Sequence, residues 1–372
     1  MSDLGLIIFS FGGAFVIAVL LTLVIKRLAK KLNVLDYPGH DRDRKIHIQP
    51  KPLLGGWAIY LAFTGVVLTL MLTNQLTSDS IAPKVVYGLL IAGLLIMIGG
   101  SLDDKFNFKP AKQLIWSILA CGIVIISGLG MDFITNPLGG IIKLDTWKVT
   151  VFSMEGIGYQ LTLLADLITF IWLMGMMYTT KLLDGLDGLV SGITMIGAII
   201  IFGVTQMTDV NQMGTGLIAL ALAGSCAGFL IYNFTPAKIF LGQGGSLLVG
   251  FLLGSLAIVS GGKIATALLI MGIPILDVIW VITRRLFIEK RSAFSTDRKH
   301  LHFRLLDVGF SHRSAVLFLY LLTLIFGSTT LFFRGLEKLY ALIVLAVVMV
   351  GLGVWLVMRY QKINQQNNTT NG

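Results

Sequence analysis

The sequence predicts an all-α protein that crosses a membrane about eleven times, and three observations support this prediction. Of its 372 residues, 55% are hydrophobic and only 13% are charged, which is too little charge to solvate a globular surface of this size. The mean hydropathy is +0.85. The 42 glycines exceed the usual share of about 7%, as expected where helices pack closely without a hydrophobic driving force between them.

Apolar runs of about 17 to 25 residues mark the expected spans. They lie at residues 4–26, 53–74, 85–101, 113–130, 160–180, 187–207, 214–233, 245–261, 264–283, 315–333 and 339–358. The first run has no basic segment before it and no small-residue cleavage site, so we expect it to stay attached. We therefore expect one membrane domain over residues 1–360, followed by a polar, disordered cytoplasmic tail over 361–372.

The distribution of positive charge predicts the orientation. Only six of the 29 lysines and arginines fall in the gaps on one side of this topology: Lys84, Lys143, Lys148, Lys263, Arg334 and Lys338. Because basic residues concentrate in cytoplasmic loops, we expect the N-terminus outside and the C-terminus in the cytoplasm. All five histidines then lie on the cytoplasmic side. On the other side, alternating residues through 141–151 predict a short external β-hairpin.

Two pairs of aspartates end or follow spans on the predicted cytoplasmic side. Asp103 and Asp104 diverge by about 100° on a helix; alone, they are better explained as a solvated helix end. Asp184 and Asp187 are three residues apart, which places both carboxylates on one side of a helical turn. Capping aspartates in a glycine-rich break are the alternative. Together, the two pairs suit a hard divalent cation that bridges a diphosphate.

Three further segments carry polar residues on the same side. A glycine-rich turn over residues 233–246 precedes an apolar helix and is either a phosphate-binding turn or a plain connection. The loop with His300, His302 and Arg304 is basic, so its imidazoles suit phosphate better than a metal; an unspecialised basic loop is the alternative. The first loop, with Lys45 and His47, is expected to meet a lipid phosphate or only to set the topology.

Two further acids lie inside predicted spans, and the chain as a whole is basic. Asp166 and Asp277 lie within predicted spans, where acids are candidates for function or for helix-to-helix hydrogen bonds. The net charge of +10 does not indicate nucleic-acid binding, because the basic residues are confined to gaps between apolar runs. There they would meet anionic headgroups or phosphorylated substrates.

As a set, these motifs resemble those of the bacterial polyprenyl-phosphate N-acetylhexosamine-1-phosphate transferases. The matching segments are Arg44 to His47 with Gly55 and Gly56, Asp103 with Asp104, Asp184 to Asp187, Asn233 to Lys238, and His300 to Arg313. The segment His300 to Arg304 is more similar to the N-acetylglucosamine branch than to the peptidoglycan branch, which transfers phospho-MurNAc-pentapeptide and typically has three successive histidines.

The resemblance implies a multi-pass transferase of the bacterial cytoplasmic membrane with its active site on the cytoplasmic face. It implies transfer of N-acetylhexosamine-1-phosphate from a UDP-sugar to undecaprenyl phosphate, with release of UMP, at the start of lipopolysaccharide, teichoic acid or other cell-wall glycan synthesis. Mg²⁺, or Mn²⁺ in its place, is the implied cofactor, and a homodimer is expected only by analogy.

Residue roles follow from the motifs and the resemblance together. The expected catalytic residues are Asp103, Asp104, Asp184 and Asp187. The expected substrate-binding residues are Lys45, His47, Lys112, Lys181, Asn233, His300, His302 and Arg304. The expected metal ligands are Asp104, Asp187 and Gln243.

Three departures from the family pattern leave alternatives open. Gln243 stands where the family usually has an aspartate, Lys181 and Tyr178 where it commonly has asparagines, and Phe303 where a further histidine is frequent. Gln243 would then supply a neutral carbonyl ligand, or Lys181 would partly replace the metal, or the site would be inactive. A catalytically silent scaffold or regulator is therefore the main alternative function, and a polyprenyl-lipid carrier or flippase is a weaker one.

Overall fold

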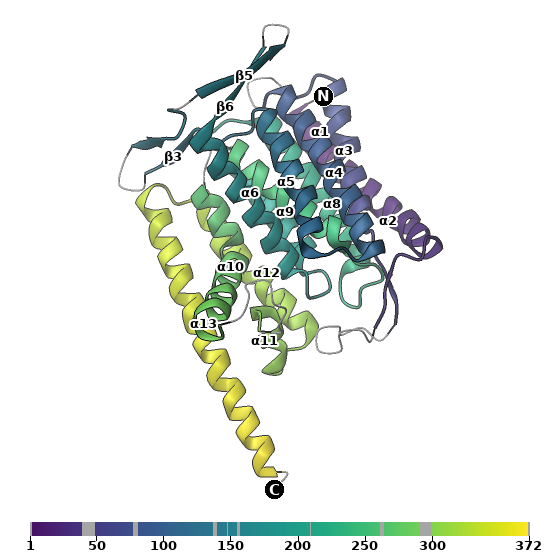
Figure 1. Cartoon of the computed structure of the whole chain (residues 1–372), viewed down its shortest axis with the longest axis vertical. Helices are drawn as coiled ribbons and strands as arrows, with labels where there is room; N and C mark the ends of the chain where they lie inside the picture. Colours follow the sequence, from purple (N-terminus) through teal and green to yellow (C-terminus); the bar gives the residue numbers. More distant parts are fainter. Residues whose placement is uncertain are drawn as a thin grey trace.

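The computed structural model describes residues 2–38, 49–76, 81–136, 140–146, 148–154, 157–208, 210–260, 264–290 and 299–370. In these ranges the chain is mainly helical, and the long helices stand side by side in one bundle (Figure 1). Its α-helices are α1 (Asp3–Ile8), α2 (Ala14–Lys31), α3 (Gly56–Leu72), α4 (Pro83–Phe106), α5 (Pro110–Ile126), α6 (Leu163–Leu183), α7 (Leu189–Thr205), α8 (Met213–Asn233), α9 (Gly242–Val259), α10 (Ile264–Thr283), α11 (Leu301–Asp307), α12 (His312–Ser328) and α13 (Leu336–Thr370).

Each apolar run predicted from the sequence coincides with a helix. Among the described residues, eight helical segments are long and apolar enough to cross a membrane, and α3, α5 and α7 are apolar but shorter. Short π-helical or 3-10 turns continue some of them: η1 (Phe9–Gly13) joins α1 to α2, η2 (Arg284–Ile288) extends α10, and η3 (Thr329–Leu331) extends α12. The chain is therefore a mostly helical, polytopic membrane protein.

Glycines permit close packing around α9, which lies at the centre of the bundle. A Cβ atom built on Gly100 of α4 would lie 2.1 Å from the Cα of Gly244, and one on Gly56 of α3 would lie 2.3 Å from the Cα of Gly245. The helix backbones therefore touch, as small residues allow inside a membrane. This contact fixes the end of α4 against the start of α9, where the polar residues lie.

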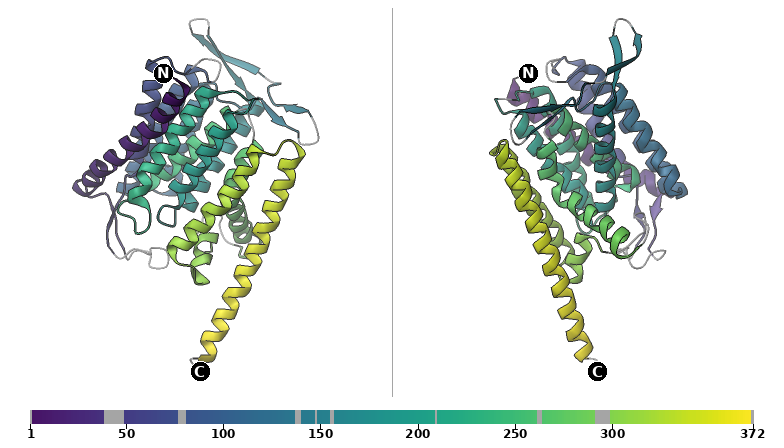
Figure 2. Two further views of the ribbon diagram at one scale, coloured as in Figure 1. Left: turned by 180° about the vertical axis from the view of Figure 1, so that it is seen from behind. Right: turned by 60° about the vertical axis from the view of Figure 1, so that its left-hand side comes forward.

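Short strands lie outside the bundle. β1 (Leu35–Asp36) pairs with β2 (Lys51–Pro52), β3 (Phe133–Thr135) with β4 (Ile141–Lys143), and β5 (Lys148–Met154) with β6 (Ile157–Thr162), all antiparallel. The presence of β-hairpin structure after α5 is thus confirmed. This segment forms two hairpins, β3–β4 and β5–β6, and residues 141–151 run across β4 and β5. Figures 1 and 2 show both hairpins at the end of the bundle that lies away from the C-terminus.

Helix α13 extends well beyond the rest of the molecule (Figures 1 and 2). It runs to Thr370, so the described part of the segment predicted to be a disordered tail is helical. The division into a membrane domain and a separate tail stays a prediction. Helix α11 was not predicted, because its seven residues are too few to show a periodic pattern.

Candidate active site

The polar motifs converge at the end of the bundle opposite the two hairpins. The end of α4, the connection between α6 and α7, the turn before α9 and the short helix α11 contact one another there. These segments are separated by up to about two hundred residues in sequence. The structure therefore brings together Asp103, Asp104, Asp184, Asp187, Lys181, Gln243, His300 and His302, which the sequence analysis had selected separately.

Asp104 caps the N-terminus of α9. The backbone N–H of Gln243 donates to both of its carboxylate oxygens, at 3.0 and 3.2 Å, and a negative charge is favourable at this end of a helix dipole. Gly242 makes the contact possible, because its φ of +76° favours glycine and an added Cβ would lie 2.4 Å from Oδ2 of Asp104. Asp104 also lies within electrostatic range of Asp103, Asp184 and Lys181.

Asp103 is connected to Lys181 through Gln113. Asp103 is only 6% exposed, and its Oδ1 accepts hydrogen bonds from the Phe108 N–H at 2.9 Å and from Gln113 Nε2 at 3.1 Å. The Lys181 ammonium donates to Gln113 Oε1 at 2.8 Å. A positive charge is therefore held beside the aspartate pair. Gln113 lay outside every motif, and nothing in the sequence marks it.

The turn with Asp184 and Asp187 is held by the segment before α9 and by α12. Asp187 Oδ2 accepts from the Ala237 N–H at 2.8 Å, and the Asp187 N–H donates to His312 Nε2, also at 2.8 Å. Because Nε2 accepts, neutral His312 carries its proton on Nδ1. His312 was quoted in the family motif but was not selected as a site residue.

Asp184 has no hydrogen-bond partner for its carboxylate among the described residues. Its side chain keeps an exposed surface, while the carboxyl group lies among the neighbouring polar segments. Desolvation by these surroundings, and then the charge of Asp187, raises the pKa of Asp184 to about 7. The protonated and ionised forms of Asp184 are thus both populated at neutral pH, and a cation bound nearby would favour the ionised form.

His302 packs directly against this turn, and His300 supports it from behind. His300 Nδ1 donates to Asp277 Oδ2 at 2.9 Å, and the Leu301 N–H donates to Asp277 Oδ1 at 2.8 Å. The intramembrane acid Asp277 therefore anchors the start of α11. The His302 ring stacks on His300 with centroids 5.7 Å apart and presses against Gly185, where an added Cβ would lie 2.3 Å from Nε2.

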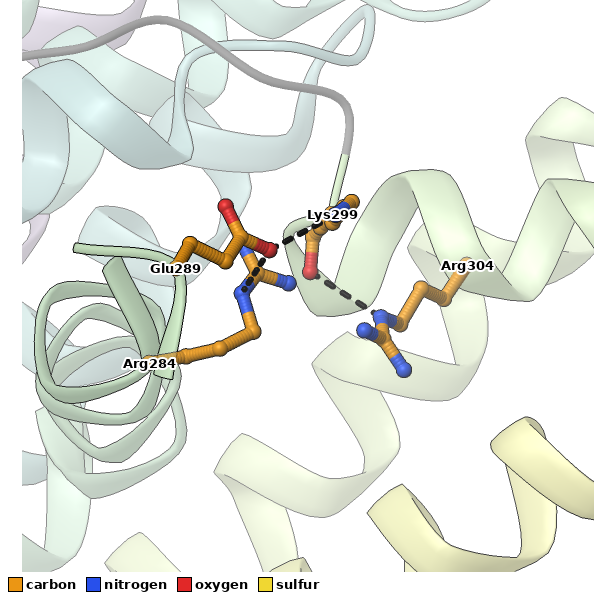
Figure 3. Close-up of polar contacts among 4 residues, drawn as sticks. All are labelled: Arg284, Glu289, Lys299 and Arg304. Carbon is orange, nitrogen blue, oxygen red and sulfur yellow. Dashed lines mark hydrogen bonds and ion pairs between the residues drawn. The ribbon is translucent and has the colours of Figure 1, made fainter. Parts of the chain in front are cut away.

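Arg304 does not share the face of His302. Two residues along a helix rotate the side chain by about 200°, so Arg304 lies on the side of α11 that faces α13. Its Nε donates to the Lys299 carbonyl at 3.1 Å (Figure 3). The figure also shows Lys299 Nζ and Arg284 Nε on the same oxygen of Glu289, at 2.7 and 3.2 Å. Arg304 and His302 therefore lie on different sides of α11, and the expected role of Arg304 in substrate binding stays a prediction.

The remaining candidate residues differ in burial and in their contacts. Asn233 is 4% exposed and braces the chain: Oδ1 accepts from Ser191 Oγ at 2.9 Å and Nδ2 donates to the Ile239 carbonyl at 3.0 Å. Lys112 is exposed and lies over the ring of Phe108. Lys45 and His47 lie outside the described residues. Asp166, at the far end of α6, accepts from the Thr162 N–H at 2.7 Å.

The donor atoms of this site fit a hard divalent cation only in part. Among the described residues, the Asp184 carboxylate, Asp187 Oδ1 and the buried Gln243 Oε1 accept no hydrogen bond, so these oxygens are available to a cation. In that same part, no three His, Cys, Asp or Glu side chains already form a ligand cluster. This fits Mg²⁺, which typically takes one or two protein carboxylates and completes its shell with water and substrate phosphates.

These features define a class: a polytopic membrane protein with carboxylates, imidazoles and an ammonium gathered at one end, suited to a phosphorylated substrate. The family model described as glycosyl transferase family 4 matches residues 86–261, which include both aspartate pairs and Gln243.

Similar proteins extend the match over most of the chain. The chain is 33% identical to the decaprenyl-phosphate N-acetylglucosaminephosphotransferase of Mycobacterium leprae, over 91% of this chain and 87% of that protein. It is 28% identical to the undecaprenyl-phosphate alpha-N-acetylglucosaminyl 1-phosphate transferase of Yersinia pestis, over 83% of this chain and 77% of that protein. This chain belongs to glycosyl transferase family 4, and the resemblance inferred from the motifs is confirmed.

Proposed function

We propose that this protein transfers N-acetylglucosamine-1-phosphate from UDP-N-acetylglucosamine to undecaprenyl phosphate or a similar polyprenyl phosphate. The observation that carries the proposal is the convergence of both aspartate pairs, Lys181 and the two histidines at one end of the bundle. The relatives named as N-acetylglucosaminephosphotransferases with polyprenyl-phosphate acceptors support it. The product would begin a lipid-linked cell-wall or surface glycan.

The reaction that suits this site is an in-line displacement at phosphorus. An oxygen of the lipid phosphate attacks the β-phosphorus of the UDP-sugar, the bond from that phosphorus to the bridging oxygen breaks, and UMP leaves with the bridging oxygen. His300 and His302 are buried against Asp277 and Gly185, so we expect them to act on the diphosphate by positioning the turn that carries Asp184 and Asp187. Lys181, held by Gln113, would offset negative charge beside Asp103 and Asp104. Preorganised charges of this kind contribute strongly to catalysis.

A divalent cation, Mg²⁺ or Mn²⁺, would neutralise the diphosphate and stabilise the charge of the leaving UMP. Of the expected ligands, Asp187 and the Gln243 carbonyl would hold it. We propose Asp184 as the third ligand in place of Asp104, because both carboxylate oxygens of Asp104 already accept from the Gln243 N–H. We therefore expect excess chelator to abolish UMP release and added Mg²⁺ to restore it. Full activity of the unchanged protein in chelator would mean that Lys181 replaces the metal. The Lys181→Met variant is the matched comparison, because it should then lose its activity in chelator.

We also propose that the polar end faces the cytoplasm and that all eleven apolar helices span the inner membrane. A membrane-impermeant maleimide should then label Ile141→Cys, on the exposed strand β4, in intact spheroplasts. Lys105→Cys, exposed at the end of α4, should be labelled only after permeabilisation. The native Cys121 and Cys226 are buried. Labelling of Lys105→Cys in intact cells would reverse the proposed orientation.

The donor can be tested with the purified full-length protein. UMP release should require undecaprenyl phosphate and UDP-N-acetylglucosamine together, and should be at background with UDP-MurNAc-pentapeptide. Release with the pentapeptide donor alone would assign the protein to the peptidoglycan branch instead. No release with any UDP-sugar, from protein that unfolds cooperatively, would favour the silent scaffold.

A further inference from the structure

A cavity lies between α11 and the C-terminal part of α13, apart from the acidic site. Its volume is about 560 Å³; Lys299, Arg304 and Asp307 line one side, and residues of α13 between Leu356 and Gln361 line the other. None of the clustered aspartates lines it. The size is within the range of ligand sites, roughly 300 to 1,000 Å³.

The cavity lies at the level where α13 changes from apolar to polar. The apolar run of α13 ends at Leu356, Val357 and Met358, and Arg359, Tyr360 and Gln361 follow. A tyrosine beside basic residues at such a boundary is typical of a membrane interface. The cavity therefore combines a charged wall on the α11 side with a wall on α13 that is apolar at Leu356 and Val357 and polar at Tyr360 and Gln361.

The charged wall is held in place by the contacts in Figure 3. Arg304 donates through Nε to the Lys299 carbonyl, and the Lys299 ammonium lies 2.7 Å from Glu289, which also pairs with Arg284. The Nε bond positions the Arg304 guanidinium at the cavity wall, and the ion pair with Glu289 positions Lys299 beside it. Such a preformed cation is favourable for a phosphate group.

We propose that this cavity binds the headgroup of an anionic phospholipid, with one acyl chain along Leu356 and Val357. The lining has two cations and one carboxylate, Asp307, which suits a singly charged phosphodiester. Asp307 would repel the second charge of a phosphate monoester, such as the end of polyprenyl phosphate, but accept a hydrogen bond from a headgroup hydroxyl. A glycerol headgroup fits both requirements, so phosphatidylglycerol is the class of lipid expected.

The proposal is tested by native mass spectrometry of the full-length protein in neutral detergent, with phosphatidylglycerol or phosphatidylcholine added. Phosphatidylglycerol should be retained preferentially, and Arg304→Gln should weaken its binding about fivefold, the contribution of one basic residue near an anionic surface. The matched control is Arg359→Gln, which removes an exposed charge from the neighbouring helix outside the cavity. Its binding should stay within about twofold of the unchanged protein.

Two further measurements keep the test decisive. If Arg304→Gln lowers the unfolding temperature, Val357→Trp replaces it, because it fills the apolar wall without changing a charge and should also reduce lipid retention. Millimolar inorganic phosphate should not displace the lipid. Equal losses in Arg304→Gln and Arg359→Gln, equal binding of phosphatidylcholine, or full displacement by phosphate would each overturn the proposal.

Discussion

Replacing Asp187 by Asn is expected to lower the rate of UMP release by about 10³-fold, the loss typical when a charge-stabilising group is removed from an active site. The substitution removes the negative charge and keeps the shape. The amide oxygen of Asn can still accept the hydrogen bond that Asp187 takes from the Ala237 N–H at 2.8 Å. The turn before α9 should therefore remain folded, and the loss should appear as a lower kcat.

The matched control for this variant is Asp166→Asn. Asp166 also accepts a backbone N–H, from Thr162 at 2.7 Å, but it lies at the opposite end of α6, away from the aspartate cluster. Its activity should stay near that of the unchanged protein. An Asp187→Asn protein that keeps more than about a tenth of the rate would exclude the charge of Asp187 from the chemistry.

Replacing Gly185 by Ala is expected to reduce activity by about 100-fold, although it adds a single methyl group. The methyl would lie 2.3 Å from His302 Nε2, so the imidazole must move, and a displacement of about 1 Å in an active site can cost this much. The backbone itself tolerates alanine, because Gly185 is not among the glycines with a left-handed φ.

Two comparisons separate this effect from a loss of folding. Gly175→Ala, ten residues earlier in the same helical hairpin, has nothing within 4 Å of the new methyl and should keep full activity. The double variant Gly185→Ala with His302→Ala should be no slower than His302→Ala alone, because the clash is then absent. An additive loss would mean that Gly185 acts independently of His302.

The positions of the helices along the chain could be predicted because a bilayer constrains the sequence of each one. Each spanning helix must satisfy its backbone polar groups internally and face lipid or other helices with apolar residues, so hydropathy alone locates it. The convergence of Asp103, Asp184 and His300 followed from the topology, since helix ends on one side of a membrane meet in one layer. The two hairpins were only partly predicted, because strand patterns in a short polar segment are weak.

The finer geometry of the site could not be predicted, because it depends on contacts between distant segments. Gln113 bonds to Lys181, which lies 68 residues further along the chain, and also to Asp103. No local pattern marks such a link. Arg304 was grouped with His302 because the two are close in sequence, but the seven-residue α11 turns them to opposite sides. Asp277 was partly anticipated: an acid inside an apolar run is costly, which marked it as a candidate for function or for a hydrogen bond, but its partner His300 is known only from the structure.

The most direct test of the proposed function follows the β-phosphorus itself. The purified protein would be incubated with undecaprenyl phosphate and UDP-N-acetylglucosamine that carries ³²P only at the β-position. We expect the label to enter the organic phase as a lipid diphosphate sugar and the released nucleotide to be unlabelled UMP. Label that stays in the aqueous phase as UDP would show transfer of the sugar without its phosphate, and would contradict the assigned reaction.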